Sequence, residues 1–316
     1  MKLVFCGTPR FAVPTLEALL GAGHQIPLVV TQPDRPVGRA QQMIAPPVKQ
    51  TALAAGLAVM QPDKIRNNVN FRAQLEAIAP EIIVVVAYGR IIPPWMLALP
   101  RLGCVNLHAS LLPKYRGAAP IQWAVAMGEA VTGNTTMLLE QGLDTGPILL
   151  QQEVAIGPDE TAADLFEVLA ERGAPLVVET LMRLDDGSAT PKPQDDSQAT
   201  LAPMLEREDG RMDFATRTAE ELRNRWRGFQ PWPGAFAILE GRKLVFTRLL
   251  IAAPPYPNDL PVGRPGELHF ASGCLFLACA NGTWLEVREL QPEGKRRMTA
   301  AEFWRGARLN AGARLG

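Results

Sequence analysis

The sequence predicts an α/β protein in which a doubly wound, mostly parallel sheet is followed by a small β-barrel or sandwich. Over residues 1–180, apolar strand-like runs alternate with amphipathic helical stretches, which is typical of βαβ units. Over residues 206–316, short strand-like runs are separated by Gly, Pro and Asn, which is typical of an all-β domain. With 316 residues, of which 47% are hydrophobic, the chain can fill two cores.

The strands expected in the first part are continuous apolar runs of β-branched character, as in strands that are covered on both faces. They are LVFCG (3–7), IPLVVT (26–31), IIVVVAYG (82–89) and GCVNLH (103–108). Helical spacing appears between them in FAVPTLEALLGAG, VKQTALAAGL and NFRAQLEAIA. Further on, TTMLLEQGLDTGPILLQQEVAI has apolar runs broken by a turn, and TAADLFEVLAERGAPLVVETLMRL predicts a long amphipathic helix that closes the domain.

We expect a first domain at residues 1–184, a linker at 185–205 and a second domain at 206–316. The linker is polar, contains Pro and has no period. Beyond it, the strand candidates are AFAILEG, KLVFTRLLI, GCLFLACA and TWLEVRELQP. No internal repeat interrupts this division.

Charge is balanced overall but not along the chain. Lys plus Arg and Asp plus Glu each number 32, so no net charge indicates a nucleic-acid or membrane partner. Residues 1–204 carry 15 basic and 19 acidic side chains, whereas residues 205–316 carry 17 and 13, which gives net charges of −4 and +4. This asymmetry indicates an anionic partner for the second half, with ordinary solvated surface charge as the alternative.

Cysteine use and hydropathy predict a cytoplasmic protein. Cys6, Cys104, Cys274 and Cys279 lie mostly in apolar runs and show no CxxC spacing, which favours reduced, buried thiols. The first apolar segment is too short for a signal-peptide core, and no segment reaches the roughly 18 uncharged apolar residues of a membrane span.

Asn106 and His108 stand two residues apart at the end of the run 103–108. In a strand, alternation directs both side chains to one face, and ligands bind beyond the carboxyl ends of parallel strands. A histidine near a strand end is often only a hydrogen-bonded structural residue, but the neighbouring amide makes a functional pair an equal alternative. Asp144, in LDTGPIL, either caps a turn or pairs with His108, because an unpaired carboxylate between apolar runs is costly.

Two other kinds of site are disfavoured. CGTPRF places Gly7 at a βα turn but lacks the second and third glycines of GxGxxG, so a dinucleotide site is not expected. No metal site is expected either, because the three histidines are far apart in the sequence and no cysteine pair has ligand spacing.

A set of motifs matches a known family. FCGTPRFAVPTLEAL, VVTQPDRPVGR, VVVAYGRIIP, VNLHASLLPKYRGAAPIQWA and GLDTGPIL, in this order, and FQPWPGA in the second half resemble methionyl-tRNA formyltransferases along almost the whole chain. The Asn-x-His…Asp set is shared by folate-dependent formyltransferases in general, whereas TQPDRPxGR and LHxSLLPxxRGAAPIQ are much more specific. The resemblance implies a Rossmann-like formyltransferase domain and an OB-like C-terminal domain.

The same resemblance implies an activity and its reactants. The formyl group of 10-formyltetrahydrofolate would pass to the free amino group of initiator methionyl-tRNA, giving N-formylmethionyl-tRNA for translation initiation. No metal, membrane or obligate protein partner is implied. The alternatives are a relative that formylates a nucleotide-sugar amine or hydrolyses formyltetrahydrofolate, and a non-catalytic tRNA-binding module.

Carried over by residue, the resemblance makes Asn106, His108 and Asp144 the catalytic set. The Asn106 amide would donate to the oxyanion, and His108 would add a donor or move protons while Asp144 fixes its tautomer. Whether Asp144 or His108 deprotonates the amine stays open. The residues expected against the folate are Ser110, Leu111, Leu112 and Pro113.

Expected tRNA contacts lie in both halves of the chain. The long loop after the second strand carries Arg35 and Arg39, which the resemblance directs toward the acceptor stem. In the second half, the expected contacts with the tRNA backbone are Arg225, Arg227, Lys295 and Arg296, although such charge runs are often only solvated faces. Leu201 and Met204 stand where family members often have Tyr and Lys, which leaves the linker's contribution to tRNA binding open.

Overall fold

The structure is a computed structural model, and it describes residues 1–316 except 38–40, 253–262, 308 and 310–311. The described chain divides into two compact units. The first comprises Met1–Pro120, Val131–Ala155 and Leu165–Pro203, and the second comprises Ile121–Ala130, Ile156–Asp164 and Met204–Gly316. Two short segments that precede residue 165 therefore belong to the second unit. The domain boundaries expected at residues 184 and 205 stay a prediction.

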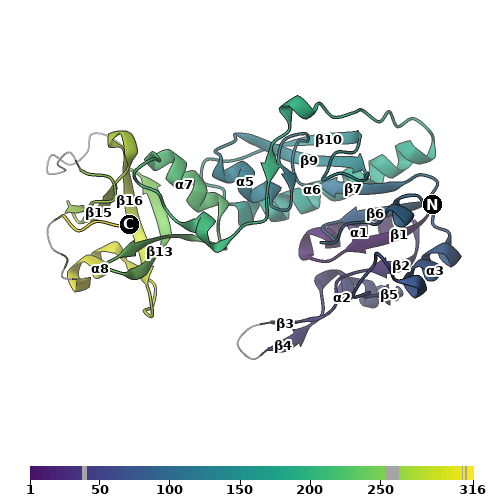
Figure 1. The fold of residues 1–316 in the computed structure, drawn as a ribbon, viewed down its shortest axis with the longest axis horizontal. Coiled ribbons are helices and arrows are strands. Elements are labelled where there is room, and N and C mark those ends of the chain that lie inside the picture. The colour runs from purple at the N-terminus through teal and green to yellow at the C-terminus, as the bar shows by residue number, and fades with distance from the viewer. Residues whose placement is uncertain (38–40, 253–262, 308, 310–311) are drawn as a thin grey trace. The chain divides into compact units, whose positions relative to one another are not determined.

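The first unit is built on a seven-stranded sheet with the order β10-β9-β7-β6-β1-β2-β5 (Figure 1). Its strands are β1 (Lys2–Gly7), β2 (Gln25–Val30), β5 (Val59–Met60), β6 (Ile82–Val86), β7 (Cys104–His108), β9 (Val131–Leu138) and β10 (Ile148–Ala155). The pairs from β5 to β7 are parallel, whereas β9 pairs antiparallel with both β7 and β10. The prediction of a mostly parallel sheet is confirmed.

Helices cover this sheet on both faces. They are α1 (Val13–Gly21), preceded by a 3-10 turn η1 (Arg10–Ala12), α2 (Pro47–Ala54), α3 (Val69–Ile78), α4 (Pro94–Leu97) and α6 (Ala162–Asp185). One core joins β-strand residues such as Ile83 and Cys104 to Phe71 and Leu75 of α3. On the opposite face α6 packs closely, because a Cβ on its Gly173 would lie 2.6 Å from Leu107 Cδ2. Cys104 and Leu107 of β7 therefore lie on opposite faces of the sheet.

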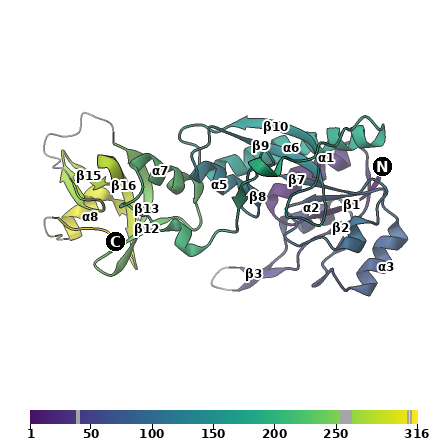
Figure 2. The same cartoon turned by 45° about the horizontal axis from the view of Figure 1, so that its top comes forward.

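Two small ladders accompany the main sheet. Strands β3 (Arg35–Val37) and β4 (Gln42–Ile44) form an antiparallel pair on either side of residues 38–40. Strand β8 (Arg116–Gly117), labelled in Figure 2, pairs in parallel with β11 (Leu201–Ala202). The segment predicted as a linker thus supplies a strand to the first unit, together with a 3-10 turn η2 (Asp196–Gln198).

The second unit contains a six-stranded sheet with the order β12-β13-β16-β15-β14, and β17 pairs with β16. Its strands are β12 (Ala235–Leu239), β13 (Arg242–Ile251), β14 (Leu268–Ala271), β15 (Cys274–Ala278), β16 (Trp284–Pro292) and β17 (Met298–Thr299). Its helices are α5 (Pro120–Ala126), α7 (Ala219–Gly228) and α8 (Ala300–Ala307), with 3-10 turns η3 (Arg207–Gly210) and η4 (Ala280–Gly282). The five ladders between its strands are all antiparallel.

Residues 313–316 connect the two edge strands of this sheet. The backbone of Gly316 exchanges hydrogen bonds of 3.0 and 2.9 Å with Ile238 of β12. On the other side, Leu268 N of β14 donates to Ala313 O at 3.0 Å. Leu315 is buried in the core of the sheet. The ladder is therefore closed into a barrel by four residues that form no assigned strand.

The cysteines are free and mostly buried, as the sequence predicts. All four cysteines are free thiols, and Cys274 alone among them is half-buried rather than buried. Burial raises the pKa of Cys104 and of Cys279 to about 12. Within the described ranges, no helix is both long and apolar enough to cross a membrane.

Candidate active site

His108 and Asp144 meet at the carboxyl end of β7. Asp144 Oδ2 lies 3.6 Å from His108 Nδ1, and the two side chains are 15% and 6% exposed. His108 Nε2 lies 2.9 Å from the carbonyl oxygen of Tyr115. Because a carbonyl only accepts hydrogen bonds, Nε2 carries a proton. A neutral His108 ring therefore presents an unprotonated Nδ1 to Asp144, and Tyr115 rather than Asp144 sets the tautomer in this arrangement.

Asp144 is held from the backbone. Its Oδ2 accepts a hydrogen bond of 2.8 Å from Gly117 N, and its own φ of 53° lies in the left-handed region. Gly117 has φ 127°, and a Cβ there would lie 2.5 Å from Ala202 O, so only glycine fits beside β11. The pairing of β8 with β11 thus sets the direction of the N–H that binds the carboxylate.

Asn106 lies in β7 between Val85 of β6 and Met137 of β9. Alternation puts it on the same face as Cys104 and His108, as predicted. Its side chain is half-buried, and within the described part of the chain it donates no hydrogen bond. The amide protons are therefore available to a bound molecule.

The loop after β7 is held by side chains of β9 and β10. Thr135 Oγ1 donates to Ser110 O at 2.7 Å and accepts from Leu112 N at 3.1 Å. Gln151 Nε2 donates to Leu112 O at 2.9 Å. The Ser110 hydroxyl donates a hydrogen bond of 2.7 Å to Lys114 O. These bonds fix the backbone of the loop in one shape.

The four predicted folate contacts divide by exposure. Ser110 and Leu112 are buried, whereas Leu111 and Pro113 are half-buried and keep apolar surface open. The peptide bond between Leu112 and Pro113 is cis. Leu111 and Pro113 can contact a ligand directly, and the other two shape the loop that presents them.

The predicted tRNA contacts in α7 point inward. Arg227 is 5% exposed, and its Nη1 donates to Gly157 O and Glu160 O at 3.1 and 2.9 Å. Arg225 Nη2 donates to Asp209 O at 2.9 Å, and the guanidinium lies 4.8 Å from the centroid of Phe229. Burial lowers the pKa of both guanidinium groups. This arrangement favours a packing role for both, and their contact with tRNA stays a prediction.

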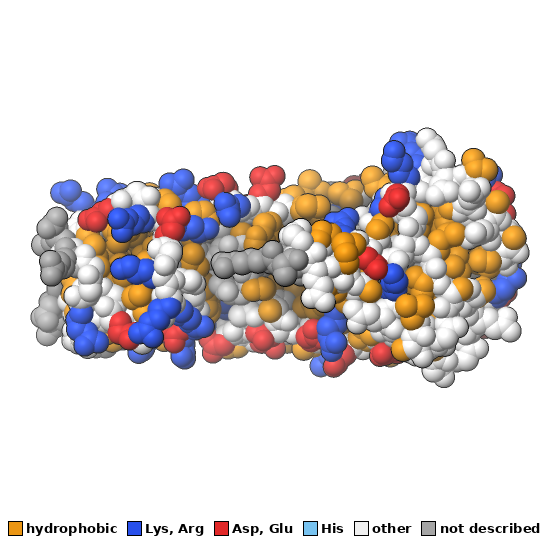
Figure 3. Space-filling model, turned by 90° about the horizontal axis from the view of Figure 1, so that it is seen from below, with side chains coloured by type: hydrophobic (Ala, Val, Ile, Leu, Met, Phe, Trp, Pro, Cys, Tyr) orange, Lys and Arg blue, Asp and Glu red, His pale blue; other side chains and the backbone are white. Residues whose placement is uncertain are grey.

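The other predicted tRNA contacts are exposed where they are described. Arg35 is exposed on β3, and Arg39 lies outside the described residues. Lys295 and Arg296 are exposed between β16 and β17, with Arg296 Nη2 3.9 Å from Glu302 Oε1. On the face shown in Figure 3, blue Lys and Arg side chains gather over the left end, with red acidic side chains among them. Leu201 and Met204 are also exposed.

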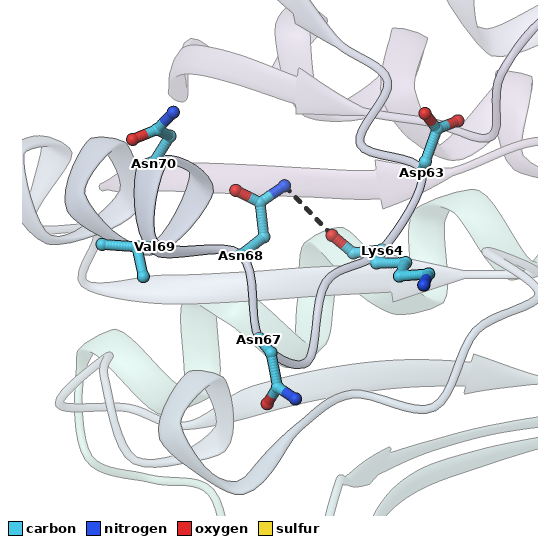
Figure 4. A pocket seen from close by; sticks show the side chains of 6 residues that line it. All are labelled: Asp63, Lys64, Asn67, Asn68, Val69 and Asn70. Carbon is cyan, nitrogen blue, oxygen red and sulfur yellow. Dashed lines mark hydrogen bonds between the residues drawn. The ribbon is translucent and has the colours of Figure 1, made fainter.

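A shallow depression lies away from these residues, at the start of α3 (Figure 4). It is lined by Asp63, Lys64, Asn67, Asn68, Val69 and Asn70. Asn68 caps the helix, since its Oδ1 accepts from Phe71 N at 3.0 Å and its Nδ2 donates to Lys64 O at 3.1 Å. The depression is explained by this cap and includes none of the predicted site residues. Among the described residues, no group of three or more His, Cys, Asp or Glu is arranged to hold a metal.

The chain matches two family models and many curated proteins. The model described as formyl transferase matches residues 1–181, and formyl transferase, C-terminal domain, matches residues 204–308. The chain is 65% identical to the methionyl-tRNA formyltransferase of Acidobacterium capsulatum, with 100% of both chains covered. It is 54% identical to that of Koribacter versatilis, with 100% of this chain and 99% of the relative covered.

Solved structures share the fold at low identity. An N-formyltransferase from Helicobacter canadensis, in complex with folinic acid and dTDP-3-aminofucose, has a TM-score of 0.65 at 18% identity and covers 91% of this chain and 98% of its own. HypX from Aquifex aeolicus, in complex with tetrahydrofolic acid, has a TM-score of 0.59 at 16% identity. The match covers 96% of this chain and 46% of the HypX chain. These likenesses concern the fold alone.

Proposed function

Because this chain belongs to the methionyl-tRNA formyltransferase family, we propose that it transfers the formyl group of 10-formyltetrahydrofolate to the amino group of initiator methionyl-tRNA. The product, N-formylmethionyl-tRNA, starts translation, and we expect the protein to act in the cytoplasm. The observation that carries the proposal is the contact between His108 and Asp144 at the end of β7, in a chain that aligns end to end with its relatives.

A folate-type donor fits the loop after β7. Leu111 and Pro113 offer half-buried apolar surface beside the buried His108, and Thr135 fixes the loop that carries them. Apolar surface next to a few placed polar groups is what small-molecule sites commonly provide. Folates are also named with two solved structures of the same fold.

Asn106 would stabilise the oxygen of the formyl carbon as the amine adds to it. Its amide donates no hydrogen bond within the described ranges, so it can do so without breaking a bond of the protein. One donor of this kind is typically worth about 10²–10³ in rate. A half-buried position strengthens such a bond because less water competes for it.

His108 and Asp144 would act together as the proton acceptor. The ammonium group of the aminoacyl end must lose a proton before its nitrogen can attack. Nδ1 of the neutral His108 ring is unprotonated, and a proton taken up there lies against the Asp144 carboxylate, which stabilises the imidazolium. The attacking nitrogen loses two protons in becoming an amide N–H. One of them can pass through the pair to the departing folate nitrogen, and the other is released to water, so that no net proton stays on the pair.

Contact with tRNA would involve both units. The exposed Lys295 and Arg296 belong to the half of the sequence with net charge +4, and Arg35 and Arg39 flank or lie in the loop between β3 and β4. Arg225 and Arg227, the other predicted tRNA contacts, donate to carbonyls of the second unit, so we expect them to support that unit rather than to bind phosphate. Basic side chains on an anionic backbone bind by releasing counterions.

The test is transfer of labelled formyl from 10-formyltetrahydrofolate to three acceptors: initiator methionyl-tRNA, the same tRNA without methionine, and a nucleotide-sugar amine. We expect transfer only to the first, because the reacting group is the methionine amine. Transfer to the sugar amine alone would assign the chain to another formyltransferase activity. Binding of tRNA without any transfer would make it a binding module.

A further inference from the structure

Gln194 joins the segment predicted as a linker to the loop of Asp144. Its Nε2 donates to Asp144 O at 2.8 Å and to Gly146 O at 2.7 Å, which uses both amide protons. Its Oε1 accepts from Arg116 Nε at 3.0 Å and from Arg116 Nη2 at 2.7 Å. Since a guanidinium only donates, the amide has one orientation, with its nitrogen toward the loop.

Arg116 connects this amide to the other anchor of the carboxylate. It is 7% exposed, and its Nη2 also donates to Asp196 Oδ1 at 2.8 Å. The next residue, Gly117, donates its N–H to Asp144 Oδ2. Gln194 therefore holds the backbone of Asp144, while the neighbour of Arg116 holds its carboxylate.

The loop needs such support because its own conformation is unfavourable. Asp144 has φ 53°, in the left-handed region, which Asp tolerates better than most residues but which still costs more than extended or helical backbone. Gly146 lies so close to Leu138 O that any Cβ would collide with it. In a loop without regular pairing, the two hydrogen bonds from Gln194 take the place of a strand partner.

We propose that Gln194 is a positioning residue for formyl transfer, which holds the Asp144 carboxylate at His108; this rests on the proposed function above. The segment between the two predicted domains is then part of the catalytic machinery as well as a connection. A shift of the carboxylate by about 1 Å can lower the rate about 10²-fold. Loss of the clamp should accordingly act on kcat more than on substrate binding.

The sharpest variant is Gln194→Glu. The glutamate side chain has the same length and still offers an oxygen to Arg116. It replaces the amide nitrogen that donates to Asp144 O and Gly146 O with a second oxygen, which cannot donate. We expect kcat to fall roughly 10- to 100-fold while KM for the folate stays within about threefold. The matched control is Gln198→Glu, the same change on an exposed side chain of the same segment, whose Nε2 bonds Asp195 and no other described residue. The control should keep wild-type kcat.

A second readout does not depend on activity. In hydrogen exchange followed by mass spectrometry, Gln194→Glu should speed exchange in peptides covering residues 115–118 and 140–147 and leave β1 and β6 unchanged. If the new carboxylate prevents folding, Gln194→Met removes the donors without adding charge and takes its place.

The outcomes separate the two proposals. Lower kcat with locally faster exchange supports a positioning role. Wild-type kcat in the folded variant overturns it, and so does faster exchange throughout the first unit, which would make Gln194 merely structural. If the wild-type chain transfers no formyl to any acceptor, the proposed function fails, and the exchange experiment still decides whether Gln194 holds the loop.

Discussion

The Asp144 carboxylate lies 3.6 Å from His108 while it accepts a hydrogen bond from Gly117 N. A backbone donor cannot rotate away as a side chain can, so the carboxylate has one defined position. That position depends on β8 and on the segment around Ala202 that pairs with it. Residues far apart in sequence thus determine the geometry of one contact.

Asn106→Ala should lower kcat about 10²–10³-fold and leave stability nearly unchanged. The amide donates no hydrogen bond to another described residue, so its removal leaves no partner unsatisfied. Steady-state formyl transfer gives kcat, and a thermal melt gives the stability. A variant that keeps more than about a third of wild-type kcat would remove Asn106 from the reaction.

Gly133→Ala should destabilise the first unit by about 1–3 kcal/mol, as overpacked cores do. A Cβ at this position of β9 would collide with Gln152 O and lie 2.6 Å from Leu111 Cδ2. Because Leu111 must move, KM for the folate should also rise. Chemical denaturation and folate kinetics test both effects.

Gly21→Ala is the matched control, since a Cβ at the end of α1 meets open space. Its stability should stay the same or increase slightly. Equal stability of the two variants would show that the strand relaxes freely around Leu111.

Arg227→Ala should lower stability, whereas the double variant Lys295→Ala, Arg296→Ala should change the salt dependence of tRNA binding. The half-exposed backbone at Gly157 and Glu160 accepts two hydrogen bonds from Arg227, so loss of this side chain should lower stability by at most about 1.5–3 kcal/mol for each bond. The salt dependence of tRNA binding should stay unchanged. The exposed pair should keep its stability. For the double variant, the slope of log tRNA affinity against log salt concentration should become shallower by about 0.7–0.9 for each lost phosphate contact.

Binding of tRNA over a salt series, with denaturation of each variant, checks this division. A shallower slope for Arg227→Ala in a stable protein would mean that this side chain leaves its carbonyls to meet phosphate.

Most of the fold could be predicted because its signals are local. The runs at 3–7 and 103–108 appear as β1 and β7, and the long helix appears as α6. The run 82–89 gives a strand only to Val86, because Ala87 and Gly89 adopt positive φ. Strands β14 and β17 were not predicted, since they are short. The closure by residues 313–316 depends on partners distant in the sequence.

The candidate site could be predicted only in part. Asn106 and His108 share a face because alternation is a local rule. Gln194 and Gly117 were missed because one acts through a single amide in a polar segment and the other through its backbone, and neither leaves a sequence pattern. The inward position of Arg227 was missed for a similar reason: charge alone does not tell which side of a helix is buried.

The central claim is that His108 and Asp144 together carry formyl transfer to initiator methionyl-tRNA. Single-turnover transfer from 10-formyltetrahydrofolate, measured for wild type, His108→Ala and Asp144→Asn, tests it most directly, because the amide oxygen of the second variant still offers an acceptor to Gly117 N. We predict rapid transfer by the wild type and a loss of about 10²–10⁴-fold in each variant, with melting temperatures and folate affinity close to wild type. Near wild-type transfer by either folded variant would contradict the claim.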